Sequence, residues 1–122
     1  MINTNRVVPI QAVDLISMYG LILQQNNSTL AAVSSNTVEG DFNITSASTP
    51  LILNEPVNSV NIASGVSSAT IYFVAGYNYQ GFTVNNVAAT VADNDVEVNP
   101  DGKTLYKAVL STGTITITQV GF

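Results

Sequence analysis

Residues 104–120, TLYKAVLSTGTITITQV, alternate between apolar and polar side chains on both sides of a Ser-Thr-Gly turn. Alternation with a period of two is typical of a strand that buries one face and exposes the other. In the second half, Ile115 and Ile117 therefore point to one face and the threonines to the opposite face. The sequence predicts two strands, 104–110 and 114–120, joined as a hairpin.

A second turn signal lies just upstream, at residues 99–102 (Asn-Pro-Asp-Gly). Pro at the second turn position and Gly at the fourth predict a type I turn with a left-handed glycine, closing a hairpin between 96–98 and 104–110. Short apolar runs broken by Gly, Pro, Asn and Ser predict further strands at 30–34, 37–45, 51–53, 59–63, 69–75, 80–84 and 87–91. No internal repeat is evident. The predicted fold is mainly β, an antiparallel β-sandwich or small barrel.

Residues 1–27 have a different pattern. Residues 1–8 predict an extended arm, and Pro9 can open a helix because its fixed φ suits the first turn. Over 10–25 the apolar side chains recur at helical spacing, and their face is broad enough to join the core or to contact another protein or copy. We therefore divide the chain into an N-terminal arm and helix, 1–27, and a β-domain, 28–122, within one folding unit.

Composition narrows the function. The 122 residues include no His, no Cys and no Trp, and only three Lys or Arg, with a net charge of −5. Without His or Cys, the usual acid–base group, thiolate nucleophiles and most zinc sites are ruled out. Phosphate binding needs clustered basic side chains, so we expect neither nucleic acid nor an acidic membrane as a partner. We expect no enzyme activity, no cofactor and no metal.

The acidic residues Asp93, Asp95 and Glu97 alternate, so in a strand their carboxylates would share one face. Calcium prefers such oxygen ligands. The spacing is not that of an EF-hand, and a solvated acidic strand end is the favoured interpretation.

The sequence makes an enzyme improbable, but two catalytic arrangements can be considered. Lys103 or Lys107 could activate a serine, and paired carboxylates, either Glu39 with Asp41 or the 93–97 cluster, are the less improbable of the two arrangements. Nothing in the spacing fixes a geometry for either, and both lysines are better explained as strand and turn residues. We assign no catalytic residue.

Residues 76–82, Gly-Tyr-Asn-Tyr-Gln-Gly-Phe, form the most distinctive loop candidate. Tyrosines beside amides can stack on sugars or anchor a protein interface. The favoured alternative is a turn or bulge whose rings cover the sheet edge. The candidate partner-binding residues are those of the arm and of this loop: Arg6, Val7, Val8, Pro9, Tyr77 and Tyr79.

Several stretches carry a family resemblance. TNRVVP at 4–9, VDLI at 13–16 and YGLIL at 19–23 resemble the start of small virion proteins of tailed bacteriophages. The stretches at 39–42, 71–74, 77–82 and 101–107 are similar in style. The chain thus resembles head decoration (cement) or head-fibre proteins, a group without a catalytic motif.

The resemblance implies a β-rich, homo-oligomeric and often trimeric domain on the outer surface of the virion head. Such a domain bridges neighbouring subunits of the major capsid protein and is assembled in the host cytoplasm, which agrees with the lack of a predicted export signal. The alternative function is a carbohydrate- or host-surface-binding module of a tail, fibre or cell-surface domain, acting through Tyr77 and Tyr79.

Overall fold

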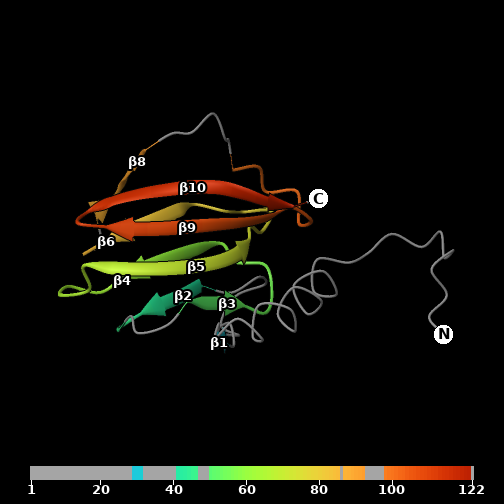
Figure 1. The fold of residues 1–122 in the computed structure, drawn as a ribbon. Coiled ribbons are helices and arrows are strands. Elements are labelled where there is room, and N and C mark those ends of the chain that lie inside the picture. The colour runs from blue at the N-terminus through green and yellow to red at the C-terminus, as the bar shows by residue number, and fades with distance from the viewer. Residues whose placement is uncertain (1–28, 32–40, 47–49, 86, 93–97, 122) are drawn as a thin grey trace, which may run out of the picture.

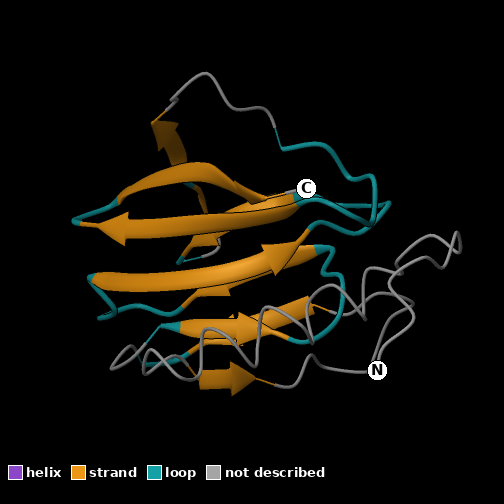
Figure 2. Ribbon diagram, turned by 45° about the vertical axis from the view of Figure 1, so that its right-hand side comes forward, coloured by secondary structure: helices purple, strands orange, loops and turns teal. Residues whose placement is uncertain are grey.

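The structure is a computed structural model, and all of its described elements are β-strands (Figure 2). It describes residues 29–31, 41–46, 50–85, 87–92 and 98–121. The predicted mainly β fold is confirmed. The predicted arm at 1–8, the predicted helix at 10–25 and the boundary after residue 27 lie outside the described residues.

The first six strands alternate between two sheets. In the six-stranded sheet A, β1 (Thr29–Ala31), β3 (Leu51–Leu53) and β5 (Ser68–Val74) lie side by side and parallel. In the four-stranded sheet B, β2 (Asp41–Ile44), β4 (Ser59–Ile62) and β6 (Gly81–Val84) do the same, in register. Each pass of the chain through both sheets therefore lies beside the pass before it, as in a β-solenoid.

The C-terminal strands complete both sheets. In sheet A, β5 pairs antiparallel with β9 (Leu105–Ser111), and β9 with β10 (Thr114–Gly121), as Figure 1 shows. The outermost strand, β8 (Thr90–Ala92), runs parallel to β10. Sheet B ends in the two-residue β7 (Val87–Ala88), antiparallel to β6.

The hairpin between β9 and β10 confirms the clearest sequence prediction. Thr112 and Gly113 form its loop, and both have positive φ, 46° and 86°, as a type I′ turn requires. Ile115 and Ile117 are buried, whereas Thr114 and Thr118 are exposed.

Two predictions are wrong. The sheets are mixed and not antiparallel, because alternation between two sheets brings successive strands of one sheet into parallel contact. Residues 99–102 do not close a hairpin, since β9 has β5 and β10 as its neighbours, although Gly102 has the predicted left-handed φ, 71°. The structure also contains repeated passes where none is evident in sequence. Equivalent residues of successive passes through sheet B are first 18 and then 22 residues apart. The passes have only one short strand pattern in common.

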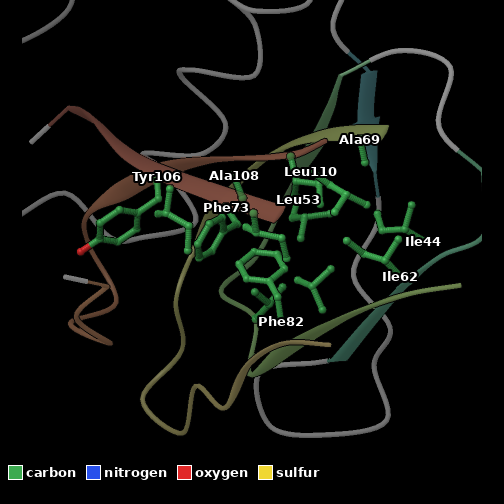
Figure 3. Close-up of a cluster of buried hydrophobic side chains, with 14 of the residues drawn as sticks. Ile44, Leu53, Ile62, Ala69, Phe73, Phe82, Tyr106, Ala108 and Leu110 are labelled. Carbon is green, nitrogen blue, oxygen red and sulfur yellow. The ribbon is translucent and has the colours of Figure 1, made fainter. Parts of the chain in front are cut away.

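The core lies between the two sheets and is centred on aromatic rings (Figure 3). Phe73 of β5 is fully buried and contacts Phe82 of β6 edge-to-face, with ring centroids 5.2 Å apart. Tyr106 of β9 lies beside it at 5.5 Å. Aliphatic side chains of both sheets, including Ile44, Leu53, Ile62 and Leu110, surround these rings (Figure 3).

Candidate functional site

A ladder of side-chain hydrogen bonds crosses the outer face of sheet B. Asn61 of β4 donates through Nδ2 to Oδ1 of Asn43 in β2, at 3.1 Å, and Thr83 of β6 donates through its hydroxyl to Oδ1 of Asn61. One row away, the Ser59 hydroxyl donates to Oδ1 of Asp41 at 3.2 Å. These residues, Asp41, Asn43, Ser59, Asn61 and Thr83, form what we call the polar ladder. It exists because parallel, in-register strands place equivalent side chains next to one another.

An open hollow of about 350 Å³ lies at the carboxyl ends of the three parallel strands of sheet B. Three amides, from Asn43, Asn61 and Asn85, contribute to its lining together with aliphatic and hydroxyl groups. The described residues that line it include no charged side chain, so they offer hydrogen bonds to a neutral polar group and no countercharge to an ion.

The outer face of sheet A is rich in hydroxyls toward the β9–β10 turn. Cross-strand register places Ser68, Ser111 and Thr114 in one row and Thr70, Val109 and Thr116 in the next. The third row is Tyr72, Lys107 and Thr118. These nine residues define the hydroxyl face, on which Lys107 is the only charged side chain. The face is exposed or half-buried throughout.

The same face becomes apolar beyond Tyr72. Ile52, Val74 and Leu105 form a small cluster with Tyr72 packed against it, separate from the main core. All three aliphatic side chains are fully buried. The outer face of sheet A is therefore divided, with Tyr72 and Lys107 at the boundary between the polar and apolar parts.

The structure separates the two loop tyrosines that the sequence groups together. Tyr77 is 69% exposed, and its ring lies over Gly102, within about 3.2 Å of where a Cβ on that residue would stand. Tyr79 instead packs into the core, with its ring 5.8 Å from Phe73 and 6.1 Å from Phe82. Tyr77 is the one of the two that presents its ring to solvent.

Burial has a chemical consequence for Tyr79. Its hydroxyl is buried and has no hydrogen-bond partner among the described residues. Desolvation raises the pKa of Tyr79 well above its ordinary value. A phenol held neutral in this way contributes packing, and it is not an exposed aromatic platform.

The Asn-Pro-Asp-Gly segment acts as a side-chain cap before β9. Oδ1 of Asp101 accepts the main-chain N–H groups of Lys103 and Thr104, both at 2.9 Å, and Oδ2 accepts the Thr104 hydroxyl at 2.5 Å. Partial desolvation raises the pKa of Asp101, but these hydrogen bonds outweigh it and hold the pKa below its ordinary value of 3.8. Hydrogen bonds to this carboxylate, and not a hairpin, therefore hold the chain in position before β9.

Of the catalytic candidates, Lys103 is exposed beside this cap, and Lys107 has Tyr72 and Thr118 as its cross-strand neighbours, with no serine opposite it. Asp41 belongs to the polar ladder, and its predicted partner Glu39 lies outside the described residues.

Other predicted positions also fall outside the described part of the chain. They are the acidic stretch 93–97 and the arm residues Arg6, Val7, Val8 and Pro9. Within the described ranges, no three His, Cys, Asp or Glu side chains gather as metal ligands would. Nor does that part of the chain contain a helix with the length and hydropathy of a membrane span.

The polar ladder was not anticipated from sequence, although a signal for it exists. The strands read Phe-Asn-Ile at 42–44, Val-Asn-Ile at 60–62 and Phe-Thr-Val at 82–84, each an amide or hydroxyl between two apolar residues. Comparisons with protein-family models, curated proteins and solved structures find no match for the chain. The candidate sites therefore stand on their geometry alone.

Proposed function

We propose that this chain is a structural protein of a bacteriophage virion, a decoration or cement protein that binds across neighbouring subunits of the major capsid protein. The observation that carries the proposal is the near absence of charge on the hydroxyl face, where Lys107 is the only ionisable group apart from the phenol of Tyr72. The resemblance in sequence to head decoration and head-fibre proteins points the same way.

The physical argument concerns desolvation. Removing a charged side chain from water without a matched partner costs on the order of several kcal/mol, which a weak interface does not recover. Charged side chains are therefore depleted at the centres of protein interfaces. A hydroxyl loses less on burial and finds partners on almost any protein surface. A broad uncharged face therefore suits repeated contacts with a protein shell, and it does not attract DNA.

We infer further that the two sheets form a sandwich in place of a closed barrel, and that the protein acts as a homo-oligomer, with a trimer favoured. The arm, with Arg6 to Pro9, supplies an additional contact to the shell. The protein is assembled in the host cytoplasm and resides on the outer surface of the head. It uses no cofactor and catalyses no reaction.

The test is the copy number of this chain relative to the major capsid protein, by quantitative mass spectrometry of gradient-purified particles. We expect hundreds of copies per particle, on the order of the number of shell subunits. A handful of copies would assign the chain to a tail or fibre, and absence from particles would overturn the proposal. Deleting residues 1–9 is expected to leave a folded domain that binds particles weakly or not at all.

A second function is favoured by one observation, the exposure of Tyr77. An exposed aromatic ring can stack on a sugar, which supports a carbohydrate- or host-surface-binding module of a tail, fibre or cell-surface domain. Tyr79 does not share this role, because its ring packs against Phe73 and Phe82. Glycan binding that is lost in Tyr77→Ala and retained in Tyr72→Ala would favour this function over decoration.

A further inference from the structure

We propose that the free edge of β2 is a site for strand addition, where an extended segment of a partner protein joins sheet B as its next parallel strand. The partner is the shell protein, and in naming it this inference rests on the proposed function. The edge itself is argued from hydrogen-bond geometry alone.

On one side of β2, no described strand lies beside the main chain to accept or donate hydrogen bonds. Among the described residues, β2 is the last strand of sheet B, with β4 as its only neighbour. The carbonyl of Ile44 accepts the N–H of Ala63, at 2.8 Å, and so points toward β4. Because successive residues of a strand point their main-chain groups to opposite sides, those of Asp41 and Asn43 point to the free edge.

The polar ladder ends at the same edge, at the side-chain amide of Asn43. Thr83 donates to Asn61, and Asn61 donates to Asn43, so each strand donates to the one before it. Asn43 is exposed, and its Nδ2 has no acceptor among the described residues. A further strand with an amide or carboxylate oxygen in register with Asn43 would continue the ladder.

The neighbouring positions define the rest of the incoming segment. Asp41 accepts a hydroxyl from Ser59 on one side, so a hydroxyl or amine donor suits its other side. Phe42 is half-buried and packs against the core from the last strand of the sheet, so an apolar residue opposite it would complete its burial. The expected pattern is donor, apolar, Asn, apolar, as in the Ser-Val-Asn-Ile sequence of β4.

A second copy of this chain does not fit the edge. Two copies related by a two-fold axis would pair their β2 strands antiparallel, which breaks the in-register ladder. Head-to-tail stacking would not continue the ladder either, because the last described strand on the other side of sheet B is β7, which has two residues and is antiparallel. Neither arrangement continues the ladder, so we assign the edge to a different protein.

The test uses the full chain and a synthetic peptide, NSVNIA, which reproduces residues 58–63. In the free protein the amide hydrogens of Asp41 and Asn43 are expected to exchange faster than those of Phe42 and Ile44. Added peptide should shift the Asp41 and Asn43 amide signals saturably in nuclear magnetic resonance spectra. It should also slow their exchange by about tenfold, as one additional hydrogen bond implies.

Matched variants sharpen the test. Asn43→Pro removes the N–H that faces the free edge and leaves the main-chain bonds to β4 intact, whereas Asn43→Thr keeps that N–H. We expect the peptide to bind the threonine variant and to lose binding to the proline variant. The control peptide NSVLIA, with Leu in place of the ladder Asn, should bind at least several-fold more weakly, because it cannot accept from Asn43.

Three results of the peptide and exchange measurements would overturn the inference: no saturable shift, equal peptide binding by Asn43→Pro, or an Asn43 amide already as protected as that of Ile44 in the free chain. The comparison of Asn43 and Ile44 amide exchange needs no variant, so the inference stays testable even if Asn43→Pro misfolds. Particle occupancy separates the two proposals. Full occupancy by a folded Asn43→Pro chain would reject the edge and keep decoration, whereas peptide binding by a chain absent from particles would keep the edge and reject the shell protein as partner.

Discussion

The antiparallel strands of sheet A and the parallel strands of sheet B contribute differently to this molecule. β5, β9 and β10 are seven or eight residues long, and their inward side chains are almost entirely buried. β2, β4 and β6 are four residues each and add side-chain hydrogen bonds across their outer face. From this difference in burial we expect the antiparallel region to contribute most of the stability, while the parallel region carries the edge that we propose for strand addition.

The largest expected difference in stability between the two regions comes from the same substitution at two phenylalanines. Phe73→Ala in β5 removes a fully buried ring that contacts Tyr79, Phe82 and Tyr106, and should lower the free energy of unfolding by about 3–5 kcal/mol. Phe42→Ala in β2, where the ring is half-buried, should cost about 1–2 kcal/mol. Denaturant unfolding measures both. Equal losses of unfolding free energy would contradict the expected difference between the two regions.

Two turn glycines give a smaller difference. Gly65, after β4, and Gly102, before β9, both have positive φ, 94° and 71°, so an alanine at either costs about 1–2 kcal/mol. At Gly102 the new Cβ would also meet the Tyr77 ring, whereas nothing lies within 4 Å of the Gly65 position. Gly102→Ala should therefore destabilise more, as measured by thermal unfolding. In a Tyr77→Ala background the loss caused by Gly102→Ala should become smaller, and an unchanged loss there would contradict the explanation.

The polar ladder provides the next test, within sheet B alone. Asn61 is in two side-chain hydrogen bonds and Asn43 in one. Asn61→Ala should lower the free energy of unfolding by about 1–2 kcal/mol and Asn43→Ala by about 0.5–1 kcal/mol, from the net value of each bond. Denaturant titrations of both variants measure the difference. Indistinguishable variants would mean that the ladder adds nothing to stability.

The antiparallel region could be predicted from sequence because its signals are local. The Ile115 and Ile117 alternation and the Thr112–Gly113 turn specify two adjacent strands and the loop that joins them. Parallel pairing depends on segments about twenty residues apart, and its sequence signal is a single amide or hydroxyl between two apolar residues. Such a pattern specifies a strand but not its neighbour, so the repeated passes were missed.

The candidate site was predicted less well for a related reason. Tyr77 and Tyr79 are alike in sequence, yet the turn at 76–79 exposes one ring and directs the other into the core. Residues 99–102 contain a correct turn signal. However, the Asp101 carboxylate accepts the main-chain N–H groups just before β9, so these groups need no hairpin partner. In both cases the outcome depends on which tertiary contacts are made, and a local pattern does not contain that information.

The smallest expected effect is a pH dependence at the start of the antiparallel region. The pKa of Asp101 is held below 3.8 in the folded chain and returns to its ordinary value on unfolding. A depressed folded pKa gives stability that is present above pH 3.8 and is lost as the pH falls through the lower folded value. Unfolding of wild type and Asp101→Asn, measured from pH 6 down to about pH 2, should therefore differ in slope below pH 3.8, with wild type steeper. Thr104→Val, which removes the hydroxyl that donates to Oδ2, should reduce that difference without abolishing it. Parallel curves for wild type and Asp101→Asn would show that the cap is equally stable with a neutral side chain.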